Sequence, residues 1–154
     1  MNSATDIEAQ LRHAAATLPD WRGLDLSRQR AHIAIYREPF LSYVFAGKKT
    51  VESRFSLHRI VPYGQVTSGD VVFMKAGPIV GCFAVAWVKY VDLRDVPLEY
   101  LAAHYGKQIC ASSDFWQQKA NKRYATLMGI RDVRRLSPVT IQKTDRRAWL
   151  ALSR

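Results

Sequence analysis

The sequence predicts an α+β fold, a small mixed β-barrel of five to six strands with flanking helices. The chain has 154 residues, of which 48% are hydrophobic and 23% charged, which suits one domain with a sizeable core. Short apolar segments of strand length recur between helical segments, without the regular strand–helix alternation of a parallel sheet. The longest apolar run, residues 79–88, is about half the length of a membrane-spanning helix, so we expect no membrane segment.

An amphipathic helix is expected near the N-terminus. Apolar side chains recur at helical spacing over residues 5–18, with Thr5 as the N-cap and Pro19 as the stop. A polar connector follows, so we treat residues 1–30 as a helical extension and residues 31–154 as the main domain. The apolar stripe of this helix would also suit a protein partner.

Two strands and a short helix are expected next. Residues 32–36 have the apolar density of a strand. Pro39 suits the first turn of a helix, and Gly47 suits the position just after its last turn. Over residues 50–56, polar side chains at the even positions alternate with mostly apolar side chains at the odd positions. This period of two predicts a strand.

A hairpin and another helix follow. Strands are expected over residues 71–75 and 79–91, because the residues between them, 76–78, read AGP and are typical of a turn. Pro97 then opens a helix.

The last third is expected to hold one more helix and two strands. Asp114 would cap this helix, and residues 116–127 would give it one apolar and one basic face. The basic face would carry Lys119, Lys122 and Arg123. Strands are expected over residues 133–141 and 148–152, around a turn at residues 144–147.

Positive charge is concentrated in this last third. The chain carries 23 Lys and Arg against 13 Asp and Glu, a net charge of +10. From Lys119 onward there are ten basic residues and two acidic ones, whereas residues 1–31 are neutral overall. Such an excess is typical of a protein that meets phosphates, so a nucleic-acid partner is favoured over charge that serves solubility alone.

The cysteines and the N-terminal residues indicate which bound groups and which cellular location to expect. Cys82 and Cys110 lie in separate segments without CxxC spacing, which argues against a disulfide framework and a zinc site, and we expect no cofactor. The first residues have neither a basic nor an apolar signal region, so we expect a cytoplasmic location.

The segment from Gly47 to Arg54 is the most informative in the chain. Side chains two apart on a strand share a face, so Glu52 and Arg54 would project together, with Lys49 reaching over from the preceding turn. A carboxylate between two cations is expected to have a low pKa and to orient the guanidinium toward a phosphate or a base edge. A solvated ion pair on a strand surface accounts for the same spacing.

The pattern G-x-K-x-x-E-x-R, formed by Gly47, Lys49, Glu52 and Arg54, resembles the signature of the ASCH domain, a member of the PUA-like superfamily. Further segments are similar to that family, namely Pro39 before the motif, GDVV at 69–72, PIVG at 78–81 and DRRAW at 145–149. The resemblance covers roughly residues 31–152.

This resemblance implies a PUA-like barrel with a cleft lined by Lys49, Glu52 and Arg54, and a role in binding RNA or nucleotides. Some bacterial ASCH proteins are amidohydrolases that deacetylate N4-acetylcytidine with a lysine, a threonine and a distant glutamate. Lys49 matches the lysine, Glu52 stands where the threonine would be, and the third residue has no secure equivalent. Other ASCH-type proteins bind or cleave RNA. If the protein is a hydrolase or a ribonuclease, Lys49 and Glu52 would be its catalytic residues, with Glu52 as the general base.

Other residues are candidates for extending the binding surface. Lys75 ends a strand and would add a phosphate contact, and Tyr36 stands where an aromatic ring would stack on a base. A solvated lysine and a core tyrosine are the alternatives. Lys119, Lys122 and Arg123 would continue a phosphate-binding track. The sequence leaves open whether the cleft turns over a substrate, which RNA or nucleotide it binds, and the oligomeric state.

Overall fold

The computed structural model describes residues 4–142 and 147–152. In chain order its elements are α1 (Ala4–Thr17), the 3-10 turn η1 (Pro19–Trp21), β1 (Ala31–Ile35), α2 (Phe40–Phe45), β2 (Val51–Ser56), β3 (Val71–Lys75), β4 (Ile79–Asp92), α3 (Leu98–Ile109), α4 (Ser113–Gln118), β5 (Tyr124–Val139) and β6 (Trp149–Ala151).

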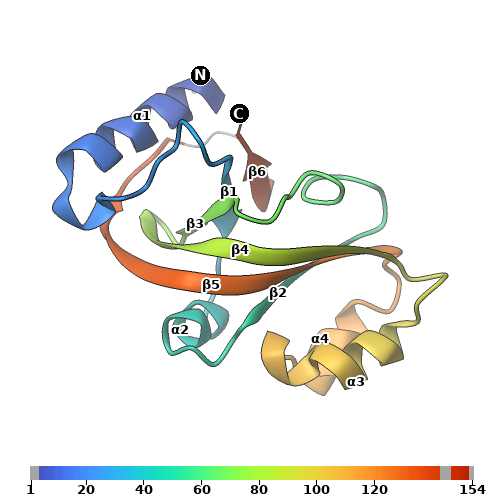
Figure 1. Ribbon diagram of the computed structural model, residues 1–154. Helices are drawn as coiled ribbons and strands as arrows, with labels where there is room; N and C mark the ends of the chain where they lie inside the picture. The colour runs from blue at the N-terminus through green and yellow to red at the C-terminus, as the bar shows by residue number, and fades with distance from the viewer. Residues whose placement is uncertain (1–3, 143–146, 153–154) are drawn as a thin grey trace.

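The centre of the molecule is one strongly curled six-stranded sheet (Figure 1). The strands lie in the order β2-β5-β4-β3-β1-β6, and β1 and β3 are parallel whereas the other neighbours are antiparallel. Among the described residues the two edge strands, β2 and β6, do not pair with each other. The predicted α+β class with a mixed, barrel-like sheet is confirmed, in the form of a half-barrel with an open seam.

The two longest strands, β4 and β5, connect the two ends of this sheet. They pair with each other from Ile79 to Asp92 of β4, with register shifts at three places along the way. Such irregularities bend a strand and increase its twist. At one end β5 pairs with β2, and at the other β4 pairs with β3.

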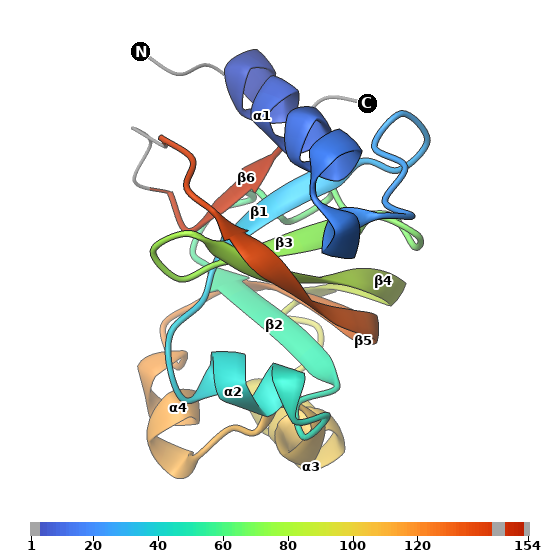
Figure 2. The same cartoon turned by 90° about the vertical axis from the view of Figure 1, so that its left-hand side faces the viewer.

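Helix α1 covers one end of the sheet, and α2, α3 and α4 lie at the other (Figure 2). The apolar stripe of α1 consists of Ile7, Leu11 and Ala14, which are all buried in one core cluster with residues of β1 and β3. The stripe that would have suited a protein partner is therefore occupied by the protein's own core.

The prediction of a helix over residues 114–127 is wrong in its second half. Helix α4 ends at Gln118, and its N-cap is Ser112, whose hydroxyl accepts from the N–H of Phe115, rather than Asp114. From Tyr124 onward the chain is strand β5, which also contains most of the strand expected over 133–141. Pairing with β2 on one side and β4 on the other satisfies the backbone of β5, and this tertiary contact outweighs the helical spacing of its apolar residues.

The other expected elements form within one or two residues of their predicted bounds. Residues 144–146 of the expected turn, and with them the first two residues of the DRRAW segment, lie outside the described residues. No helix in the described part of the chain is long and apolar enough to cross a membrane.

Candidate functional site

A pocket of about 330 Å³ lies beside the open edge of β2, and we call it the basic pocket. Its walls come from five places: the end of β1, helix α2, the turn and strand that carry the motif, helix α4 with the residue after it, and the residue before β6. The lining residues are Ile35, Tyr36, Arg37, Phe40, Lys49, Glu52, Ser53, Arg54, Phe115, Lys119 and Ala148. The three residues predicted from the motif thus line one cavity together with Tyr36 and Lys119.

The turn between α2 and β2 positions Lys49. Gly47 has a φ of +74°, a left-handed conformation that glycine adopts without strain and that commonly ends a helix. The N–H groups of Lys48 and Lys49 then both donate to the carbonyl of Tyr43, and Thr50 donates to the carbonyl of Gln108. These bonds turn the chain into β2 with Lys49 directed to the interior.

Glu52 lies at the centre of the polar contacts, with only 4% of its surface exposed. The Tyr36 hydroxyl donates to Oε2, and the N–H of Ser53 donates to Oε1 at 2.7 Å. The guanidinium of Arg54 is 3.6 Å from Oε2, and the ammonium of Lys49 is 3.9 Å from Oε1. As the strand spacing predicts, Glu52 and Arg54 lie within ion-pair distance.

Burial raises the pKa of Glu52 above its ordinary value, and the opposing effects of Arg54 and of the Ser53 N–H are smaller. The expectation of a low pKa is therefore wrong. It considered the neighbouring cations but not the loss of water around a fully enclosed carboxyl group.

Lys49 is equally enclosed, with 3% of its surface exposed. Its ammonium donates to the carbonyl of Ile109 at 2.9 Å and lies 5.2 Å from the centroid of the Phe40 ring. Burial lowers the pKa of Lys49 from 10.5 to about 7. Near neutral pH the amine therefore exists in both protonation states, so it is able to act as a cation toward an anionic ligand or as a base.

Arg54 closes the pocket on the side of β6. Its Nη2 donates to the carbonyl of Ile35 at 3.0 Å, and its Nη1 lies 3.5 Å from the carbonyl of Ala148. The guanidinium also lies over the rings of Tyr36 and Trp149, at 5.4 and 5.2 Å from their centroids. These contacts hold the cation in one orientation across the seam between β2 and β6.

A buried hydrogen-bonded chain supports the same side. The indole N–H of Trp149 donates to Nδ1 of His32 at 3.0 Å, and Nε2 of His32 lies 2.8 Å from Oδ2 of Asp70. Since Nδ1 is an acceptor in this arrangement, Nε2 carries the hydrogen and donates a hydrogen bond to the carboxylate of Asp70. The chain fixes the ring of Trp149 beneath Arg54.

Sequence reasoning missed several residues of the pocket. Arg37, Phe40 and Phe115 supply a further cation and two aromatic rings. Ser53 has a buried hydroxyl oxygen with no hydrogen-bond partner among the described residues. A serine on a strand next to Glu52 carries no signal that its hydroxyl would be left unpaired, because that depends on the elements packed around it.

Lys119 lies at the end of α4 rather than on a helix face. Its ammonium is 5.1 Å from the centroid of Phe115, and burial lowers the pKa of Lys119 below its ordinary value. It is thus the one member of the predicted basic face that lines the pocket, within the described residues.

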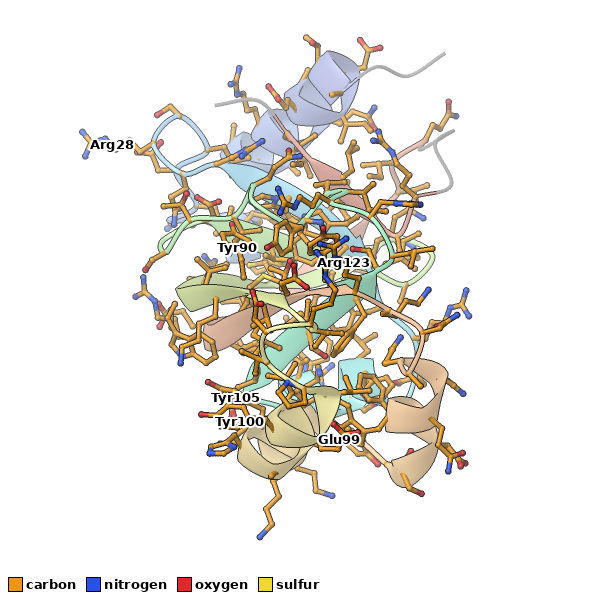
Figure 3. The ribbon with its side chains drawn as sticks, turned by 90° about the vertical axis from the view of Figure 1, so that its right-hand side faces the viewer. Arg28, Tyr90, Glu99, Tyr100, Tyr105 and Arg123 are labelled. Carbon is orange, nitrogen blue, oxygen red and sulfur yellow. The ribbon has the colours of Figure 1, made fainter. Side chains whose placement is uncertain are left out.

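Three predicted contributors do not line the basic pocket: Lys75, Lys122 and Arg123. Lys75 ends β3 and pairs with Ile79. Arg123 lies at the level of the sheet (Figure 3), where it forms an ion pair with Asp92 at 3.3 Å and covers the ring of Tyr124. Within the described residues, Lys122 and Arg123 therefore do not extend the lining of the basic pocket beyond Lys119.

Together, the curled mixed sheet and the polar pocket at its open edge define an α+β half-barrel fold. Solved structures with the same architecture make the assignment more specific. The ASCH protein of Zymomonas mobilis matches with a TM-score of 0.63 and 17% identity, over 80% of this chain and 87% of that chain. Two variants of it, with a tyrosine changed to phenylalanine and a serine changed to alanine, both match with TM-scores of 0.64. The chain therefore has the ASCH fold, which confirms at the level of fold the resemblance seen in the sequence.

No protein-family model and no curated protein matches the chain. The described residues also contain no group of three or more His, Cys, Asp or Glu side chains placed to hold a metal ion.

Proposed function

We propose that the protein binds RNA or a nucleotide in the basic pocket, with Lys49 and Arg54 contacting phosphate or a base edge and Glu52 orienting them. The observation that carries this proposal is the convergence of cations from separate elements: Arg37, Lys49, Arg54 and Lys119 line one cavity. Among the described lining residues Glu52 is the only acid, and it is buried. A cavity of this composition favours an anionic ligand.

The aromatic residues support a nucleotide over a simple anion. Phe40 and Phe115 are half-buried and line the cavity with their rings 6.2 Å apart. Aromatic side chains beside cations are typical of sites that stack a base while holding its phosphate. The ASCH fold and the net charge of +10 agree with a nucleic-acid ligand.

The test compares two adjacent lysines. We would measure binding of a labelled single-stranded RNA of mixed sequence by fluorescence anisotropy for the wild type, Lys49→Ala and Lys48→Ala. Lys48 is exposed, covers the ring of Tyr43 and does not line the pocket, so it is a matched control. Lys49→Ala is expected to weaken binding about tenfold, because it removes a charge-assisted contact, and Lys48→Ala about twofold or less.

Arg37→Ala is a second variant of the pocket that is not expected to disturb folding. Arg37 is exposed, so its removal leaves the core intact while it deletes another cation of the pocket. Equal effects of Lys48→Ala, Lys49→Ala and Arg37→Ala would show that binding depends on general surface charge, and the proposed site would be wrong.

Hydrolysis is a second candidate, favoured by two observations. The pKa of Lys49, lowered to about 7 by burial, suits a general base at neutral pH, and Ser53, which lines the same pocket, has a hydroxyl with no hydrogen-bond partner among the described residues. Glu52 still stands where the amidohydrolases have a threonine, so we expect little or no release of cytidine from N4-acetylcytidine. The measurement uses the wild type, Lys49→Ala and Glu52→Thr, alongside cleavage of a mixed RNA pool. Lys49-dependent turnover of either substrate would replace the binding function with an enzymatic one.

A further inference from the structure

A second cavity of about 470 Å³ adjoins the basic pocket along the open seam of the sheet, and we call it the apolar groove. It lies between residues 54–56 of β2 and residues 147–151, which include β6, and residues 60–62 also line it. Arg54 and Ala148 line both cavities. The two cavities are therefore consecutive along one edge, with Arg54 between them.

The walls of the groove are mostly apolar. Phe55, Val61 and Trp149 contribute hydrophobic surface, and Ile60 stands at the rim with 57% of its surface exposed. Gln65 adds an exposed side-chain amide, which is able to donate and to accept. Apolar walls with a single amide suit a nucleobase, which has flat apolar faces and a polar edge.

The position of Arg54 links the two cavities chemically. Its guanidinium has five N–H donors, and its contacts to Glu52 and to the carbonyls of Ile35 and Ala148 leave others for a ligand. Such a fork matches the two free oxygens of a phosphodiester. A second cation, Arg147, lines the groove further along. A chain of alternating phosphates and bases therefore fits this edge better than a neutral segment.

We propose that the apolar groove binds the base of a second nucleotide, so that the protein recognises a dinucleotide step. One nucleotide occupies the basic pocket, its neighbour places its base in the groove, and the phosphate between them contacts Arg54. This inference rests on the proposed function and adds the size of the recognised unit to it. The cations that border both cavities favour this occupant over a peptide strand added to the free edge of β2 or β6.

The test separates the second base from the second phosphate. Isothermal titration calorimetry would compare cytidine 3′,5′-bisphosphate, which has both phosphates and one base, with the four 5′-phosphorylated dinucleotides that begin with cytidine. We expect at least one dinucleotide to bind about tenfold more tightly than the bisphosphate, in the range found for the stacking of one base.

Two matched variants locate the gain. Ile60 and Leu57 are apolar residues of the same loop, exposed to 57% and 54%, but only Ile60 lines the groove. Ile60→Asp is expected to remove the tenfold gain and to leave the bisphosphate affinity within about twofold, because Ile60 does not line the basic pocket and its exposed charge is screened by salt. Leu57→Asp, which adds the same charge to the same loop, is expected to retain the gain.

The outcomes distinguish the two proposals. If the bisphosphate binds and no dinucleotide binds more tightly, the basic pocket stands and the groove proposal is wrong. The same conclusion follows if Ile60→Asp and Leu57→Asp lower the gain equally, or if Ile60→Asp only abolishes self-association in sedimentation. If no probe binds, the proposed function itself fails.

Discussion

The pair formed by Lys49 and Glu52 is expected to reduce the stability of the folded protein near neutral pH. Both side chains are buried, and the pKa of Lys49 falls from 10.5 to about 7. Between these two pH values the unfolded state binds a proton that the folded state does not, so the free energy of unfolding rises with pH across that window. At 1.36 kcal/mol per pKa unit, the rise between pH 7 and about pH 9.5 is roughly 3 kcal/mol.

The effect of Lys49 is isolated by comparing Glu52→Gln with Lys49→Met/Glu52→Gln, which differ only at that position. Urea unfolding followed by circular dichroism would be measured for both variants from pH 7 to about pH 9.5. The difference between the two stabilities should change by roughly 3 kcal/mol over this range, with the methionine variant gaining less as pH rises. Other titrating groups are common to both variants and cancel.

The double variant should also be at least as stable as the wild type at pH 7, since replacing a buried ion pair by uncharged side chains is often neutral or stabilising. Its affinity for RNA should nevertheless fall, because the pocket loses a cation. A pH-independent difference between the two variants would show that Lys49 keeps an ordinary pKa, and the chemistry assigned to its amine would then be wrong.

Three further predictions concern the scaffold and the charge. His32→Phe leaves the indole N–H of Trp149 without its acceptor and removes one hydrogen bond to Oδ2 of Asp70, which keeps its bond from the N–H of Thr67, so urea unfolding should show a loss of roughly 1–3 kcal/mol; an unchanged midpoint would contradict the hydrogen-bonded chain. Gly81→Ala would place a Cβ atom 2.8 Å from a backbone oxygen and should cost roughly 1–3 kcal/mol, whereas Gly106→Ala meets nothing nearer than 4.0 Å in α3 and should be stabilising by about 0.5–1 kcal/mol; equal effects would contradict the packing described. Lys119→Ala should reduce the slope of log affinity for RNA against log salt by about one, and the exposed Lys107→Ala should not; equal slopes would remove Lys119 from the site.

Much of the sheet was predictable because its strands have local signals. The strand over residues 50–56 and the turn at residues 76–78 are both determined by residues that are close together in the sequence. The first half of β5 has no such signal, because its apolar residues fall at helical spacing and its strand conformation depends on β2 and β4. The curl of the sheet likewise depends on register shifts between β4 and β5, whose paired residues are far apart in the sequence.

The candidate site also has features that the local sequence predicts and features that depend on the rest of the fold. The proximity of Glu52 and Arg54 follows from strand parity, and the structure shows it at 3.6 Å. The direction of the Glu52 pKa shift could not be predicted from the local sequence, because it depends on how completely other elements enclose the carboxyl group. Arg123 was expected to face a ligand, but it forms an ion pair with Asp92, a residue 31 positions away, which composition does not indicate.

The short strand β6 has a consequence for how the molecule is assembled. It pairs only with β1 in the described structure, and the contact between Trp149 and His32 spans 117 positions of the chain. Contacts of such long sequence separation form late, because the entropy of closing the intervening loop must be overcome first. During synthesis all the other strands leave the ribosome before β6, so a nascent chain is able to build most of its sheet while one wall of the seam is missing. The edge at which we propose that a ligand binds is therefore completed late in folding.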